Sequence, residues 1–227
     1  MTFSNIWNNG FLSQLVFANA SSLYIAVGIS MVVCIAAGYL LGSINPSIII
    51  SAKVFKDDIR RHGSGNAGMT NSLRVYGVGA AVSTTLIDAL KSVAAMVIAG
   101  QIGGVDAMIA AGAGVMLGHA YPLYFGFRGG KCVVCIAVVG SFISWQTVLI
   151  AVAMFAIIVF TTKIVSASSC GAMLTAMLAA VILGVETKRL IFIIAACSFV
   201  IFLHRGNIKR IINGTEKKIK PKGGQPK

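Results

Sequence analysis

The sequence predicts an all-α integral membrane protein with about seven transmembrane helices, some of them short. Of its 227 residues, 57% are hydrophobic and 11% are charged, and the mean hydropathy is +0.87. A soluble globular domain is about 25% charged. The nineteen Lys and Arg residues outnumber the six Asp and Glu residues, and they lie in short stretches between long apolar tracts. This composition excludes a soluble protein and favours a membrane protein with a basic face over a nucleic-acid-binding protein.

Six apolar tracts are candidates for membrane-spanning helices, and most of them reach the roughly 20 residues that one span needs. They cover residues 22–42, 76–102, 104–126, 132–162, 164–185 and 188–203. A shorter apolar tract over residues 44–55 contains Pro46. We expect it to form a partial or interfacial helix.

Two basic stretches predict how the chain is oriented in the membrane. Residues 53–74 and 205–227 are rich in Lys and Arg, so the positive-inside rule places both in the cytoplasm. Residues 1–21 contain no Lys or Arg and therefore lack the charged leader region of a secretory signal. We expect this amino-terminal segment to be retained and to lie outside the cytoplasm. Termini on opposite sides require an odd number of spans.

The long tract 132–162 contains a polar and interfacial cluster, Ser144, Trp145 and Gln146. Dividing the tract there gives seven segments. The division also puts three basic residues on the cytoplasmic side, namely Arg128, Lys131 and Lys163. A helix over 132–144 rises only about 20 Å, so it is expected to thin the bilayer or to stop part-way.

These observations predict one membrane-embedded domain over residues 22–204. An extracytoplasmic segment, 1–21, precedes it, and a basic cytoplasmic tail, 205–227, follows it. The five cysteines are odd in number, and Cys34, Cys170 and Cys197 lie within apolar tracts as small hydrophobic residues, so we expect no disulfide framework.

A glycine-rich segment over residues 63–71 is the first candidate site. It reads Gly-Ser-Gly-Asn-Ala-Gly-Met-Thr-Asn, with Arg60 and Arg61 before it and Arg74 after it. Small residues let successive backbone N–H groups point into one concavity, while hydroxyl, amide and guanidinium groups add donors and charge. This combination is typical of a phosphate site. Glycine, serine and asparagine also form ordinary turns, so a flexible basic loop is the alternative.

A second candidate site lies at residues 118–131, where Gly129 and Gly130 stand between Arg128 and Lys131. Two glycines permit close backbone approach to an anion, and the lysine adds a compact charge. A basic turn without a ligand is the alternative. His119 in the same segment is interpreted as a hydrogen-bonded structural histidine.

The third candidate site lies at the end of the last apolar tract. His204, Asn207 and Arg210 follow i, i+3 spacing, so they fall near one helical face, and Glu216 follows them. A basic helix end whose side chains extend into the interface is the alternative. Asp88 and Lys91 form another i, i+3 pair, to which we assign structural support.

The sequence gives little support for a zinc site or for a nucleophile-based catalytic triad. Cys132 and Cys135 have CxxC spacing, but no second pair or nearby histidine set completes a zinc site. The six acidic residues are scattered, and none follows a nucleophile-elbow pattern.

Together, these segments resemble the bacterial acyl-phosphate:glycerol-3-phosphate acyltransferase family. Its motifs correspond to Gly-Ser-Ile at 42–44, GSGNAGMTNSLR at 63–74, DALK at 88–91, GHAYPLYFGFRGGK at 118–131 and HRGNIKRIINGTEKK at 204–218. Order and spacing agree from about residue 22 to residue 219.

The resemblance implies a seven-helix fold in the bacterial inner membrane, with all three motifs at the cytoplasmic face. It implies transfer of a fatty acyl group from acyl phosphate to the 1-hydroxyl of sn-glycerol 3-phosphate, giving lysophosphatidic acid and phosphate at the start of phospholipid synthesis. Neither a metal ion nor coenzyme A nor nucleic acid is implied.

The residue patterns and the resemblance together assign the site residues. The expected catalytic residues are Ser64, Arg74, Lys131 and His204. The expected substrate- and phosphate-binding residues are Gly63, Gly65, Asn66, Thr70, Asn71, Gly129, Gly130, Ser166, Ser169, Asn207 and Arg210. The expected supporting residues are Asp88, Lys91, His119 and Glu216. Either His204 or the substrate phosphate can accept the hydroxyl proton.

Two departures from the family pattern add bulk beside the proposed phosphate loops, since Met69 replaces the usual alanine and Cys132 a common glycine. The alternative function is a membrane transporter for organic phosphates or other anions. A transporter should show internal repeats and polar residues near the midplane, whereas the polar residues here gather at one membrane face. This distribution favours the enzyme.

Overall fold

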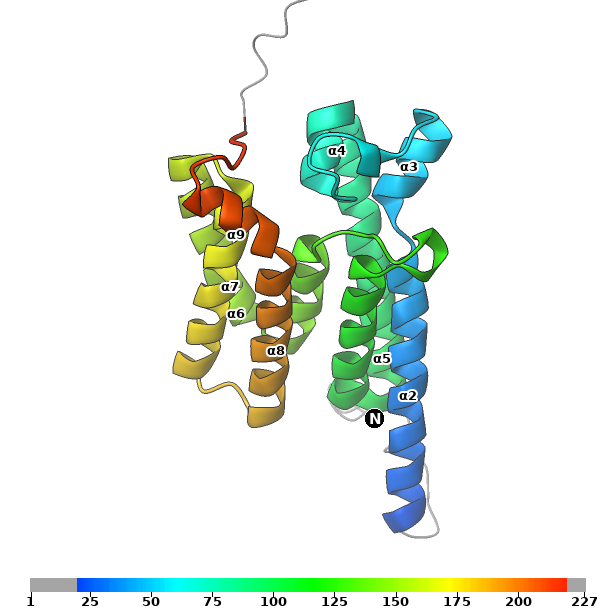
Figure 1. Ribbon diagram of the computed structural model, residues 1–227. Helices are drawn as coiled ribbons and strands as arrows, with labels where there is room; N and C mark the ends of the chain where they lie inside the picture. Colours follow the sequence, from blue (N-terminus) through cyan, green and yellow to red (C-terminus); the bar gives the residue numbers. More distant parts are fainter. Residues whose placement is uncertain (1–19, 220–227) are drawn as a thin grey trace, which may run out of the picture. The chain divides into compact units, whose positions relative to one another are not determined.

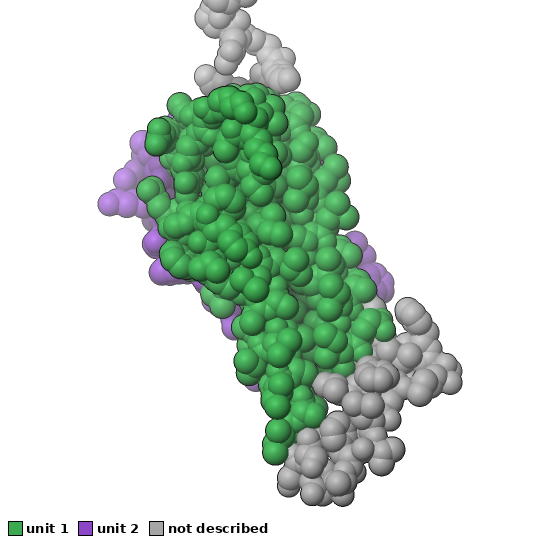
Figure 2. Space-filling model, turned by 90° about the vertical axis from the view of Figure 1, so that its right-hand side faces the viewer, with its two compact units in different colours: residues 1–143 green, residues 144–227 purple. Residues whose placement is uncertain are grey.

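The computed structural model describes residues 20–219, and within this range it contains helices and no strand (Figure 1). Nearly all of the predicted amino-terminal segment 1–21, and the end of the predicted tail, lie outside the described residues. The chain divides into two compact units, residues 1–143 and residues 144–227, which Figure 2 colours green and purple. Each unit is described by itself.

The first unit begins with α2 (Ala20–Ser43) and α3 (Pro46–Val54). The break between them follows from local chemistry, because Pro46 lacks an N–H group and favours the first turn of a new helix. The side chain of Asn45 caps that helix by accepting a hydrogen bond from the Ile48 N–H at 3.1 Å. The short helix expected within 44–55 is therefore confirmed.

Two short elements and one long element follow, namely η2 (Ile59–Arg61), α4 (Met69–Tyr76) and α5 (Val78–Ala120). Helix α5 is not straight, because Gly103 and Gly104 have non-helical dihedral angles and Gly104 has φ +61°. Lys91 and His119 are 28 residues apart in this helix, yet Lys91 Nζ and His119 Nδ1 are 3.2 Å apart. A straight helix would separate them by about 42 Å. Helix α5 is therefore a hairpin, as the division between tracts 76–102 and 104–126 predicts.

Helix α2 packs against α5 (Figure 1), and four glycines at i, i+4 spacing lie in this contact. A Cβ atom at Gly38 or Gly42 would overlap the backbone of α5, and one at Gly114 or Gly118 would overlap the backbone of α2. Small residues spaced in this way let helix backbones approach closely, which is a common packing mode between membrane helices.

A 3-10 turn, η3 (Leu123–Phe125), precedes α6 (Val133–Thr162), which crosses the boundary between the two units. Ser144 interrupts α6 with φ −157° and ψ 90°. Its hydroxyl lies 2.7 Å from that of Thr147, so the polar groups at the break are paired with each other. The predicted interruption of tract 132–162 is confirmed.

The second unit continues with α7 (Val165–Ile182), α8 (Thr187–Leu203) and α9 (Arg205–Ile212). Helices α8 and α9 meet at His204 with a bend of 58°. Helix α7 packs against α8 and also contacts α9.

Four helical stretches of the described chain are long and apolar enough to cross a membrane, and the bent pair α8 and α9 is a fifth candidate. Many large hydrophobic side chains on these helices are exposed, among them Val32, Leu86 and Phe160. Such exposure suits contact with lipid tails. The predicted class, an all-α integral membrane protein, is confirmed.

Candidate functional site

The glycine-rich loop over residues 63–68 connects η2 to α4 and is shaped by one buried amide. Asn71 accepts a hydrogen bond from the Ser64 N–H at 2.9 Å and donates to the carbonyls of Ile59 and His62 at 3.2 and 3.0 Å. Gly63 has φ +64°, and a Cβ atom there would overlap the Asn71 side chain. The side chain of Asn71, an expected substrate ligand, is thus engaged with the loop backbone.

The other expected ligands of the first motif lie on the loop and on α4. Gly65 has φ +72°, a backbone conformation that glycine adopts without strain. Ser64 and Arg74 have exposed side chains, while Asn66 and Thr70 are half-buried. The loop therefore presents one hydroxyl group outward, from Ser64, and α4 presents one guanidinium group, from Arg74.

Arg60 holds this loop to the second candidate loop. Its guanidinium group donates to both carboxylate oxygens of Asp58, with Nη2 2.9 Å from Oδ2, and donates from Nη1 to the Phe125 carbonyl at 2.6 Å. Hydrogen bonding from Arg60 lowers the pKa of the Asp58 carboxyl below its ordinary value. Arg60 thus supports the loops, whereas Arg61 is exposed.

The second loop lies against the end of α5 because two of its residues are glycines. The N–H groups of Gly129 and Gly130 donate to the carbonyls of Ala120 and His119 at 3.1 and 3.0 Å. A Cβ atom at Gly130 would overlap the His119 ring and would lie 2.8 Å from the Ala67 carbonyl of the first loop. The first unit thus brings the first two motifs together. Lys131 follows this contact and is half-buried.

Asp88, Lys91 and His119 form a buried charged cluster in the first unit, with exposed fractions of 2%, 6% and 4%. One carboxylate oxygen of Asp88 lies 2.7 Å from Lys91 Nζ and 3.1 Å from His119 Nδ1. Lys91 also donates to the Gly42 and Ile44 carbonyls at 2.9 and 2.6 Å.

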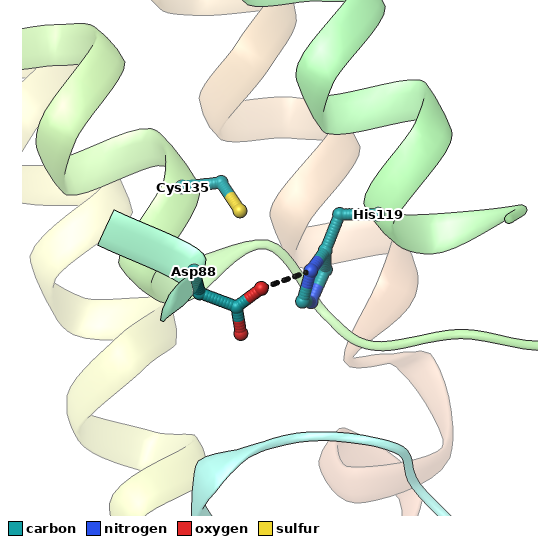
Figure 3. Close-up of side chains that lie close together, drawn as sticks. All are labelled: Asp88, His119 and Cys135. Carbon is teal, nitrogen blue, oxygen red and sulfur yellow. Dashed lines mark hydrogen bonds and ion pairs between the residues drawn. The ribbon is translucent and has the colours of Figure 1, made fainter. Parts of the chain in front are cut away.

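Cys135 completes a trio with Asp88 and His119 whose potential ligand atoms lie within 4.8 Å of one another (Figure 3). Such a trio could in principle hold a metal ion. Here the Lys91 ammonium group already pairs with the carboxylate at 2.7 Å, and it would repel a second cation. The trio is therefore part of an ion-pair cluster.

In the second unit, Glu216 gathers the expected ligands of the third motif. Its carboxylate accepts hydrogen bonds from Ser166 Oγ at 2.7 Å, Asn207 Nδ2 at 2.6 Å and Arg210 Nε at 2.6 Å. Burial acts to raise the pKa of this carboxyl, but the bonds from Asn207, Ser166 and Arg210 outweigh it and hold the pKa below its ordinary value. Three residues after Glu216 in the sequence, the Ile219 N–H donates to the Lys163 carbonyl at 2.8 Å.

His204 is buried at the bend between α8 and α9. Its Nδ1 lies 2.8 Å from the Val200 carbonyl, which can only accept, so Nδ1 carries a proton. In the neutral ring Nε2 is then the basic nitrogen. Ser169, in contrast, donates to the Val165 carbonyl of its own helix at 3.0 Å, so Ser166 rather than Ser169 joins the Glu216 cluster.

One supporting residue was not predicted from the sequence. Asn45 is fully buried, and its Nδ2 donates to the Ala67 carbonyl of the glycine-rich loop at 3.3 Å. An asparagine directly before a helix-starting proline is a recognisable cap, but that signal does not reveal the distant acceptor.

Fold and polar clusters together define a multi-pass membrane protein with glycine-rich, cation-bearing loops suited to phosphate groups. The chain belongs to the glycerol-3-phosphate acyltransferase family, whose family model matches residues 32–214.

Relatives and solved structures agree with this membership. The glycerol-3-phosphate acyltransferase of Halalkalibacterium halodurans is 43% identical over 188 residues, covering 80% of this chain and 91% of the relative. That of Mesorhizobium japonicum is 36% identical over 194 residues, covering 85% and 98%. The crystal structure of PlsY (YgiH), an integral membrane glycerol 3-phosphate acyltransferase, in its glycerol 3-phosphate form has a TM-score of 0.79 and 33% identity, covering 84% of this chain and 96% of that one.

The predicted family and enzyme class are confirmed, and the chain is an acyltransferase of phospholipid biosynthesis. The enzyme is therefore favoured over the transporter. The roles of individual residues stay predictions.

Proposed function

We propose that this protein transfers a fatty acyl group from acyl phosphate to the 1-hydroxyl of sn-glycerol 3-phosphate. The products are lysophosphatidic acid and inorganic phosphate, and the reaction takes place at the cytoplasmic face of the bacterial inner membrane. The observation that carries the proposal is the contact between two glycine loops in the first unit, at Gly130 and Ala67. The PlsY structures, described as glycerol 3-phosphate and lysophosphatidic acid forms, support the acceptor and the product.

The loops of the first unit bind phosphate groups in this proposal. Gly63, Gly65, Gly129 and Gly130 give the backbone the close approach that an anion needs, and Ser64 adds a hydroxyl donor. Arg74 offers a planar fork and Lys131 a compact charge, and both complement phosphate oxygens.

In the second unit, the proposed ligands are polar groups that can bind a hydroxyl group or phosphate oxygens. Asn207 and Arg210 are fixed by Glu216, and His204 carries a basic Nε2 at the adjacent helix end. Either this nitrogen or a phosphate oxygen of the substrate accepts the hydroxyl proton.

The reaction needs no covalent enzyme intermediate, because acyl phosphate is already an activated anhydride. The glycerol oxygen forms a bond to the acyl carbon, the bond from that carbon to the phosphate oxygen breaks, and phosphate leaves with the electron pair. Holding the hydroxyl near the acyl carbon and stabilising the developing negative charge supply the acceleration.

Purified protein in detergent tests the proposal directly. With a long-chain acyl phosphate and glycerol 3-phosphate, we expect lysophosphatidate and phosphate in equal amounts, and the reaction should persist in EDTA. Acyl-coenzyme A at the same concentration is the matched donor control and should give no product. Equal rates with both donors, or no lysophosphatidate from acyl phosphate, would contradict the proposal.

The proposed orientation has its own test in whole cells. We expect Asn5 and Glu186 outside the cytoplasm and Ser64, Gly130, Lys163 and Lys222 inside it. Single cysteines in a cysteine-free background, labelled with a membrane-impermeant reagent, report each side. Labelling of Lys163→Cys only from outside would overturn the proposed division of tract 132–162 into two spans.

A further inference from the structure

The cluster formed by Asp88, Lys91 and His119 contacts neighbours of both glycine loops of the first unit, although it belongs to neither loop. We propose that these three are positioning residues, which fix the loop 63–68 and the loop 126–131 in one relative placement. The inference rests on the proposed function, in which both loops bind phosphate groups.

One connection runs from Lys91 to the first loop. Its ammonium group donates to the carbonyls of Gly42 and Ile44, where α2 ends and its last carbonyls lack helical partners. A cation is also favourable at the negative end of the helix dipole. The next residue, Asn45, donates from its side chain to the Ala67 carbonyl. Lys91 thereby fixes the turn that holds the glycine-rich loop.

A second connection runs from His119 to the second loop. The backbone carbonyl of His119 accepts a hydrogen bond from the Gly130 N–H, and the His119 ring is so close to Gly130 that a side chain there would overlap it. The position of this ring therefore determines where the residue before Lys131 lies.

Asp88 joins the two connections because its carboxylate accepts hydrogen bonds from both Lys91 and His119. Lys91 has three N–H groups, and Gly42, Ile44 and Asp88 supply three oxygen acceptors within 2.9 Å. The 3.2 Å contact of Lys91 with His119 Nδ1 is thus not needed as a hydrogen bond. Nδ1 instead carries the proton and donates to Asp88 at 3.1 Å. The carboxylate holds both the ammonium group and the ring.

A buried ion pair that only stabilises the fold would behave differently from a positioning cluster. Removing one partner leaves an unpaired buried charge and destabilises the protein, but replacing both partners with neutral groups of similar size is often neutral for stability. The double variant Asp88→Asn/Lys91→Met therefore separates the two roles. Glu186→Gln/Arg189→Met removes an i, i+3 pair in the second unit, Glu186 being largely exposed, and is the matched control.

The readout is the distance between spin labels at Arg61→Cys and Phe127→Cys, measured by pulsed EPR on the full chain in detergent. Both native side chains are exposed, and a Cys170→Ser background leaves four buried cysteines that resist labelling. Thermal unfolding and turnover with acyl phosphate and glycerol 3-phosphate are recorded on the same preparations.

We expect the labelled parent and the control to share one narrow distance distribution. The double variant should fold, show a broadened or shifted distribution and lose at least tenfold in kcat/KM for glycerol 3-phosphate. His119→Gln keeps the ion pair and should also broaden the distribution, so it replaces the double variant if that protein does not fold. An unchanged narrow distribution in a folded variant would overturn the proposal. A broadened distribution with normal turnover would support the positioning role and would instead count against the loops as the reaction site.

Discussion

The two units of this protein hold their candidate functional side chains in different ways. In the first unit, the loops are shaped by residues such as Asn71 and Arg60. The side chain of Arg74 is exposed and takes part in none of the side-chain hydrogen bonds or ion pairs among residues 20–219. In the second unit, Asn207 and Arg210 themselves donate to the supporting carboxylate of Glu216. With the proposed roles, Arg74 binds substrate without supporting the fold, whereas Asn207 and Arg210 do both.

This difference predicts how substitutions divide their effects between activity and stability. A ligand that takes no part in supporting the fold can be removed at the expense of transition-state stabilisation alone. Removing a ligand that also donates to a partly buried carboxylate should lower stability as well, because that carboxylate is left with fewer hydrogen bonds. The substitutions below test this division, beginning with the largest expected effect.

Lys131→Ala should lower kcat by about 10² to 10³, the typical loss when one electrostatic stabiliser of a transition state is removed. We expect the variant still to insert and fold. Turnover is therefore measured per monodisperse molecule after size-exclusion chromatography.

Lys131→Arg is the control, since it keeps the charge but replaces a compact ammonium with a planar fork. We expect it to retain more activity than the alanine variant. If Lys131→Ala keeps at least half of the wild-type turnover per folded molecule, the phosphate role passes to Arg128 or to backbone donors.

Glu216→Gln should impair both stability and activity in the second unit. The Glu216 side chain is 10% exposed, and its carboxylate accepts three hydrogen bonds, one of them from Arg210 at 2.6 Å. Losing the charge should lower the free energy of unfolding by about 2 kcal/mol, the scale of a hydrogen bond to a charged group. Thermal unfolding and turnover on the same preparation measure both effects.

Glu186→Gln is the matched exposed control and should change stability little, because exposed ion pairs contribute little to it.

The pH dependence of stability is an independent check on the role of Glu216. The pKa of Glu216 is lowered in the folded state. Its contribution to the free energy of unfolding is therefore present above the unfolded-state pKa of about 4.3, and it is lost as the pH falls through the lower folded-state pKa. The stability difference between wild type and Glu216→Gln should be constant from about pH 8 to pH 5 and should shrink below about pH 4. A constant difference down to pH 3 would show that the charge of Glu216 is not what stabilises the unit.

Cys132→Gly should have the smallest effect and should be stabilising. Cys132 has φ +62°, a backbone conformation that costs a non-glycine residue about 1 kcal/mol. Relief of that strain should raise the thermal midpoint, partly offset by loss of the thiol contact with the Met116 carbonyl. Cys135→Gly is the control. It places glycine in the helical part of α6, where glycine is unfavourable, and should lower the thermal midpoint. A fall in the midpoint of Cys132→Gly would mean that the thiol contact outweighs the strain.

Local features of the fold were predictable because their causes are local. The break at Gly103 and Gly104 and the break at Ser144 both follow from short stretches of sequence. Contacts between distant residues were not predictable, since Arg60 and the Phe125 carbonyl are 65 positions apart and only the folded chain brings them together.

The candidate site was predictable at the level of motifs more than at the level of roles. Glu216 was expected to be structural, but its three donors could not be read from spacing. Asn71 was expected to bind substrate, whereas its amide is hydrogen-bonded to the loop that precedes it. A polar side chain within a motif can bind either the ligand or the backbone, and sequence pattern alone does not distinguish these uses.

The most direct test of the division between the units compares Arg74→Ala with Asn207→Ala. Thermal unfolding and turnover per folded molecule are measured on the same preparations, with acyl phosphate and glycerol 3-phosphate as substrates. We expect Arg74→Ala to lose at least tenfold in turnover with an unchanged thermal midpoint, and Asn207→Ala to lose turnover and thermal stability together. If Arg74→Ala lowers the midpoint as much as Asn207→Ala does, binding and support are not separate in the first unit, and the account is contradicted.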